Sequence, residues 1–188
     1  MSPREMAGAL YGLGLLLRFD GRAWEFFDKS LRGFWLSFAA ALIVAPFHFT
    51  HLALAFGRTP TNLGPVSYGI VQALSYILTW TLFPFAMMYV SQILARGSRY
   101  YWQMVPYNWF QLPVALTLAA LGLLNDFGII PLDAYRFASL VAMVIVAVYT
   151  TFIGAVGLRI PIGTAMSLVV LDYALTFLAG ALIAKIGT

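Results

Sequence analysis

The amino-acid sequence predicts an all-α fold: a polytopic membrane helix bundle of five transmembrane helices, preceded by an N-terminal amphipathic helix at the membrane interface. Its 188 residues are 62% hydrophobic and only 10% charged, whereas a soluble domain carries about 25% charged residues. Five apolar segments are each long enough to cross a hydrocarbon core roughly 30 Å thick, which takes about 20 residues. The connections between these segments are too short for a soluble domain, so we expect a single transmembrane domain.

The expected spans cover residues 34–56, 66–95, 104–124, 134–156 and 162–186, within a transmembrane domain of residues 34–186. Residues 1–33 are expected to form a cytoplasmic and interfacial segment. Its apolar stretch 6–17 is short for a span and lacks a convincing signal-peptide cleavage site. We therefore expect this stretch to remain in the mature protein and not to be cleaved off. Pro84 is expected to kink the second span, because proline removes a backbone hydrogen bond and clashes with the preceding turn.

Residues 21–35 read GRAWEFFDKSLRGFW, and their apolar residues recur at spacings of three and four. This period predicts a helix with one apolar face, and its charged side chains lie on the other side. Such a helix lies in the membrane surface with its aromatic rings among the headgroups; the alternative is a helix docked on the rest of the protein. The expected surface anchors are Trp24, Phe27, Leu31, Phe34, Trp35, Arg22, Lys29 and Arg32.

The distribution of lysine and arginine predicts the orientation of the chain. Eight of these residues lie in the N-terminal segment and the loops 96–103 and 157–161, against three on the other side. Because positive residues accumulate in cytoplasmic loops, we expect a bacterial inner membrane with the N-terminus in the cytoplasm and the C-terminus outside. Aromatic residues near the start of the third span are expected in an aromatic belt at the interface: Tyr100, Tyr101, Trp102, Tyr107 and Trp109.

One carboxylate, Asp172, lies within the apolar run LVVLDYALTFLAG. It is about ten residues into the fifth span, which at a rise of 1.5 Å per residue places it roughly 15 Å deep, near the bilayer midplane. An ionised aspartate costs about 2.5–3.5 kcal/mol there, so we expect it to face the bundle. Three roles are open for Asp172. It is a neutral acid whose hydrogen bond joins two helices, a relay for protons or ions, or a contact for a lipid or a partner protein. Depth counting nominates four partners: Tyr76, Thr79, Thr117 and His48.

His48 and His51 are the only histidines, and a spacing of three places them on one face of the first span. A structural zinc site needs four ligands and a catalytic one three, and no zinc-binding pattern is present. We therefore expect these rings to form hydrogen bonds within the bundle or at the interface, and we expect no metal and no cofactor. Metal or haem binding is the alternative.

Asn108, Trp109 and Gln111 form a polar and aromatic cluster at the expected cytoplasmic end of the third span. The two amides are expected to hydrogen-bond across helices or to backbone groups freed by Pro106 and Pro113. A substrate site is the alternative, because proline-interrupted helices can line binding cavities.

Several functional classes are excluded or disfavoured. The absence of cysteine rules out a disulfide, a thiolate metal site and a cysteine nucleophile. No serine–histidine–acid set and no glycine-rich phosphate loop appears, so we expect no enzyme. The arginines are scattered and suit membrane anchoring, so no nucleic acid is expected. The expected partners are the lipid bilayer and other integral membrane proteins, in a hetero-complex or a homo-oligomer.

Two segments carry a resemblance to a known family. FFDKSLRGFWLSFAAALIVAP resembles the start of the first span in the Yip1-like superfamily, and RGSRYYWQMVPYNWFQLPVAL resembles the start of the third in its alphaproteobacterial members. The resemblance covers residues 20–186 and points to bacterial five-span proteins of unknown biochemistry. It implies a non-enzymatic accessory or organising subunit that packs against other membrane proteins or lipids. The alternative is a small transporter or proton carrier that uses Asp172 with His48.

Overall fold

The computed structural model describes residues 2–58 and 61–187, and the regular structure in this part of the chain is helical throughout. The α-helices are α1 (Pro3–Leu16), α2 (Leu31–Ser37), α3 (Ala39–Ala55), α4 (Pro65–Ile93), α5 (Tyr100–Asp126), α6 (Leu132–Leu158) and α7 (Ile162–Gly187). Short 3-10 helices are η1 (Gly21–Glu25), η2 (Phe56–Arg58) and η3 (Gly97–Arg99).

Five helical segments are long and apolar enough to cross a membrane. They cover Leu31–Leu54, Pro65–Ile93, Gly97–Asp126, Leu132–Leu158 and Ile162–Lys185. The expected all-helical fold with five apolar helices is therefore confirmed, and length and composition make the chain an integral membrane protein.

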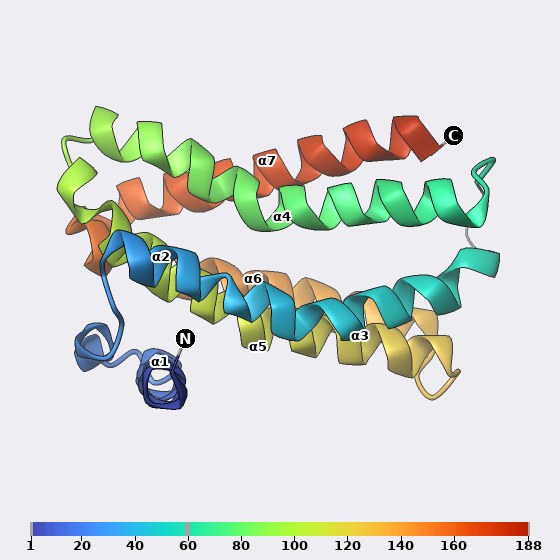
Figure 1. Ribbon diagram of the computed structural model, residues 1–188, viewed down its shortest axis with the longest axis horizontal. Coiled ribbons are helices and arrows are strands. Elements are labelled where there is room, and N and C mark those ends of the chain that lie inside the picture. Colours follow the sequence, from blue (N-terminus) through green and yellow to red (C-terminus); the bar gives the residue numbers. More distant parts are fainter. Residues whose placement is uncertain (1, 59–60, 188) are drawn as a thin grey trace.

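The five long helices lie side by side and run alternately in opposite directions (Figure 1). α3 packs on α5, α5 on α6, α6 on α7, and α7 on α4. The N-terminal segment and the loops after α4 and α6 lie at one end, which we call the N-terminal end of the bundle (Figure 1). The loops after α3 and α5 and the end of α7 lie at the other, which we call the C-terminal end.

The tightly packed core occupies the half of the bundle nearest the N-terminal end. Gly157 of α6 shows how close the helices come there: a Cβ atom at this position would lie 2.8 Å from the Cα atom of Gln103 on α5. Only glycine permits this approach without moving backbone. Large side chains that are fully buried in this half include Phe83, Met87, Met104, Ile153 and Leu158.

Residues 21–35 do not form the single helix that their spacing predicts. η1 ends at Glu25, and α2 begins only at Leu31, where it continues the first span. Ser30 starts α2, since its hydroxyl oxygen accepts a hydrogen bond from the Gly33 N–H at 3.0 Å. Capping side chains of this kind favour a helix start over a helix interior. The apolar residues at spacings of three and four therefore belong to two separate helices, η1 and α2, and to the non-helical segment between them.

Three aromatic residues of this segment pack inside the protein and do not lie on a membrane surface. Trp24, Phe27 and Phe34 are all buried, and the Trp24 indole N–H donates to the Trp102 carbonyl oxygen on α5 at 2.7 Å. A buried indole needs such a partner, so the expected placement of these three rings among lipid headgroups is wrong. The expected anchors that remain exposed are Leu31, Trp35, Arg22 and Arg32.

Lys29, another expected anchor, is half-buried against the same part of α5. Its ammonium group lies 4.7 Å from the centre of the Trp102 ring and donates to the Trp24 carbonyl oxygen. The Arg99 guanidinium carbon lies 4.5 Å from the same ring centre. Two cation–π contacts thus hold Trp102, and burial lowers the pKa of Lys29.

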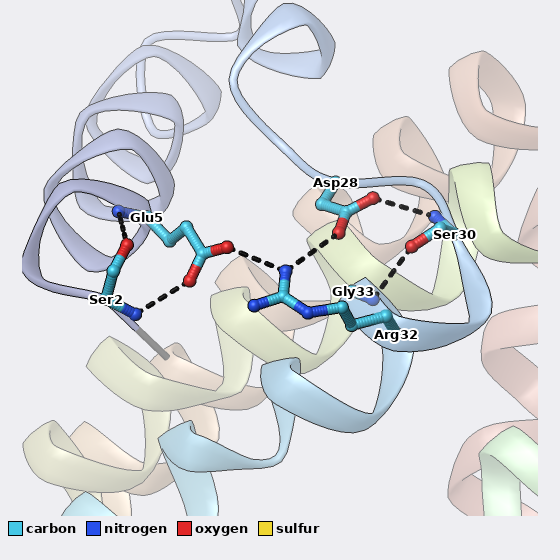
Figure 2. Close-up of polar contacts among 6 residues, drawn as sticks. All are labelled: Ser2, Glu5, Asp28, Ser30, Arg32 and Gly33. Carbon is cyan, nitrogen blue, oxygen red and sulfur yellow. Dashed lines mark hydrogen bonds and ion pairs between the residues drawn. The ribbon is translucent and has the colours of Figure 1, made fainter.

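α1 lies across the direction of the spanning helices. It covers most of the apolar stretch 6–17, for which the sequence predicts only that it is not cleaved off. Figure 1 shows α1 almost end-on, whereas the spanning helices run across the view. Ser2 caps it: the Ser2 hydroxyl oxygen accepts from the Glu5 N–H, and the Glu5 carboxylate accepts from the Ser2 N–H. Arg32 of α2 contacts both the Glu5 and the Asp28 carboxylates (Figure 2). One guanidinium nitrogen lies 2.6 Å from a Glu5 oxygen and 3.8 Å from an Asp28 oxygen.

Candidate functional site: a one-sided cavity with Asp172 at its inner end

Asp172 lies halfway along α7 and faces the bundle, with only 8% of its surface exposed. The first half of α7 packs through one face, on which Ala165, Leu168 and Val169 are also buried. The Tyr107 hydroxyl on α5 donates a hydrogen bond to one oxygen of the Asp172 carboxylate at 2.7 Å. The carboxylate is therefore shielded from lipid and held by a neighbouring helix.

A cavity of about 540 Å³ adjoins Asp172, and all five spanning segments contribute to its wall. Its lining on α5 runs from Tyr107 to Ala119, and its lining on α6 runs from Val146 back to Tyr135. Both stretches lead from the middle of the bundle toward the C-terminal end. Because the tight core fills the other half, Asp172 lies at the inner end of a cavity that extends in one direction only.

Two of the four nominated partners line this cavity without bonding to Asp172. The Tyr76 hydroxyl donates to the Ala41 carbonyl oxygen at 2.6 Å. The ring of His48 lies against that of Tyr76, with 4.8 Å between the ring centres. Both side chains therefore belong to the cavity wall, but the prediction that they pair with Asp172 is wrong.

The two nominated threonines are also not partners of Asp172. Thr79 lines the cavity, but its hydroxyl donates to the Ser75 carbonyl oxygen of its own helix at 2.9 Å. Thr117 is exposed. The partner missed is Tyr107, which the sequence places in an interfacial belt. α5 begins at Tyr100, four residues before the expected start. At a rise of 1.5 Å per residue, Tyr107 therefore lies about 6 Å deeper than expected.

His51 binds a different carboxylate, Asp126, which sequence reasoning missed. Its Nδ1 atom lies 2.6 Å from Asp126 Oδ2 at the end of α5. Gly122 makes room for the ring, because a Cβ atom there would lie 3.0 Å from an imidazole carbon. The signal was present: Asp126 ends the third span at the same end of the bundle as His51. Among the described residues, no group of three or more His, Asp and Glu side chains is placed to hold a metal.

The polar and aromatic cluster on α5 divides between two faces of the helix. The Asn108 amide N–H donates to the Ser37 hydroxyl oxygen of α2 at 2.8 Å, whereas Gln111 lines the cavity. Trp109 is buried in the core, as are Tyr100 and Tyr107. The expected aromatic belt is therefore wrong for these three rings, which are buried against the rest of the protein; the Tyr107 ring, for example, lies 4.8 Å from that of Phe83 on α4.

In the described part of the chain, the cavity wall contains a single acidic side chain and is rich in aromatic rings. Asp172 is the only carboxylate among the described residues that line it, and none of those residues is a lysine or arginine. Aromatic side chains in the wall are Tyr76, Trp80, Tyr107, Tyr135 and Tyr173. A carboxylate in such surroundings binds a cation or a proton, because desolvation makes an unpaired negative charge costly.

Comparison with protein families, curated proteins and solved structures finds no match to this chain. The resemblance to the Yip1-like superfamily stays a prediction. What the fold and cavity define is a class: a helical membrane protein with an acidic, one-sided cavity.

Proposed function

We propose that the chain is a small transporter that binds a cation or a proton at Asp172 and carries it across the membrane. The position of Asp172, at the inner end of a cavity that reaches the middle of the bundle, is the observation that supports this. Intramembrane carboxylates are costly and mark ion or proton routes when they face a cavity. The volume of about 540 Å³ falls within the roughly 300–1,000 Å³ of small-molecule sites.

The orientation proposed here places the cavity toward the outside of a bacterial inner membrane. The eight lysine and arginine residues near the N-terminal end, against three near the other, favour a cytoplasmic N-terminal end. The membrane potential, negative on the cytoplasmic side, then favours movement of a cation from the cavity into the cytoplasm. It contributes about 2.3 kcal/mol to the free energy of transport for each charge and each 100 mV.

Proton flux into liposomes that contain the purified protein tests this function. With a pH gradient imposed, we expect the wild type to change the internal pH and the Asp172→Asn variant to lose at least about tenfold of that rate, since the amide can neither bind nor release a proton. Asp133→Asn is the matched control, because this carboxylate is 95% exposed at the C-terminal end and lies outside the cavity.

An Asp172→Asn variant that is folded and inserted and keeps wild-type flux would contradict the proposal. Purification in mild detergent separates it from the accessory role that the resemblance implies. A transporter is expected as a monodisperse protein or homo-oligomer, whereas an accessory subunit is expected to retain another membrane protein in fixed proportion.

A further inference from the structure

The described side chains of the cavity wall favour a positively charged ligand, because they include one acid and no lysine or arginine. An ionised Asp172 donates no hydrogen bond, and the Tyr107 hydroxyl donates to only one of its two oxygens, so the other oxygen is left for a ligand in the cavity. Of the two histidines in the wall, His51 is already paired with Asp126. An anion would meet Asp172 with no lysine or arginine among the described lining residues to offset it.

The aromatic wall favours an organic cation over a metal ion. The hydroxyl hydrogens of two wall tyrosines are used by backbone: Tyr76 donates to Ala41, and Tyr173 donates to the Met143 carbonyl oxygen at 2.6 Å. These bonds fix the rings beside the cavity, where ring faces attract cations. A calcium ion takes six to eight oxygen ligands, whereas much of this wall is alkyl, from residues such as Val114, Leu118 and Val146.

From these features we propose that the cavity binds an amine or quaternary ammonium compound with an apolar or aromatic body, whose charged group lies at Asp172 and whose body lies among Tyr76, Trp80 and Tyr173. This rests on the proposed function, since it names the substrate class of the same site. The wall of rings and alkyl groups replaces the ligand's water shell over the body, and the carboxylate neutralises its charge.

Calorimetric titration in detergent tests this substrate class with two ligands that have the same shape and differ in charge. Benzyltrimethylammonium carries the charge, and 2,2-dimethylpropylbenzene replaces its nitrogen by carbon. We expect the wild type to bind the first at least about tenfold more tightly than the second. Asp172→Asn should remove that preference, Trp80→Leu should weaken binding of the cation several-fold, and Asp133→Asn should change neither. The ligand pair is compared on the wild type, so this arm does not depend on the folding of any variant.

Equal binding of the two ligands, no binding of the cation, or an undiminished preference in folded Asp172→Asn would overturn the assignment. Binding is measured without a membrane gradient, so it is independent of flux. Proton flux that depends on Asp172, without binding of the cation, would refute the substrate class and leave transport standing. Binding that depends on Asp172, without flux, would support the ligand class and refute transport.

Discussion

Single residues tie the N-terminal helix to the bundle, and the pair of Glu5 and Arg32 predicts how this tie responds to acid. The hydrogen bond from Arg32 lowers the pKa of Glu5 from 4.5 to about 2. A lowered pKa in the folded state means that the ionised form stabilises the fold: the contribution is complete above pH 4.5 and is lost as the pH falls toward 2. Glu5 is exposed to solvent, so we expect local loosening of α1 and no global unfolding.

Amide hydrogen exchange at pH values between 6 and 3 measures this effect. After correction for the intrinsic pH dependence of exchange, the amides of α1 should lose protection as the pH falls, while those of α6 should not. Glu5→Gln should show the loosened state at every pH. Wild-type protection of α1 that does not change between pH 6 and 3 would show that the pair does not hold the helix.

The residue scale also shows what the sequence can and cannot predict about the site. Asp172 is predictable, because an isolated carboxylate in a long apolar helix must face protein. Its partner Tyr107 is not predictable in this way, because the depth assigned to a residue depends on where its helix starts. An error of four residues in that start places a residue of the midplane at the interface instead. His51 and Asp126 pair across 75 positions in the sequence, a contact that helical periodicity does not specify.

At the scale of helices, the close contact between α5 and α6 predicts that adding one methyl group at Gly157 lowers the stability of the protein. Gly157→Ala would place a Cβ atom 2.8 Å from Gln103 Cα and 2.9 Å from the Trp102 carbonyl oxygen. Because both neighbours are backbone atoms, the helices must move apart, and we expect a loss of about 1–3 kcal/mol in the free energy of unfolding. Thermal unfolding in detergent measures it.

Gly163→Ala is the control for this change, since a Cβ atom at Gly163 of α7 has nothing within 4 Å. It should leave the unfolding temperature unchanged or raise it slightly, because alanine favours helix over glycine. If Gly157→Ala were as stable as this control, α5 and α6 would not be in the close contact described.

The same scale explains why the spans are predictable and the N-terminal segment is not. Span length follows from the thickness of the hydrocarbon core, so each expected span overlaps one apolar helix. Residues 21–35 carry a helical period, but Ser30 accepts a backbone hydrogen bond and starts a new helix. A cap of this kind competes with helix continuation, and hydrophobic periodicity alone does not register it.

For the whole molecule, the alternating helices and the one-sided cavity predict which residues reagents reach from each side of the membrane. The chain has no cysteine, so single cysteines can be introduced without a background. Ser98→Cys lies in the exposed loop at the N-terminal end, and Asp133→Cys lies at the start of α6, at the C-terminal end. On intact cells, a membrane-impermeant maleimide should label Asp133→Cys only, and permeabilised cells should add Ser98→Cys.

Ser139→Cys extends the same experiment into the cavity wall. Because the cavity extends toward the C-terminal end, this cysteine should react from the outside, more slowly than Asp133→Cys. Benzyltrimethylammonium should slow it further by occupying the space in front of it, while leaving Asp133→Cys unaffected. Labelling of Ser98→Cys and Asp133→Cys from the same side would refute the five-span topology. Labelling of Ser139→Cys from the cytoplasmic side alone would instead reverse the direction in which the cavity opens, and with it the side from which a substrate reaches Asp172.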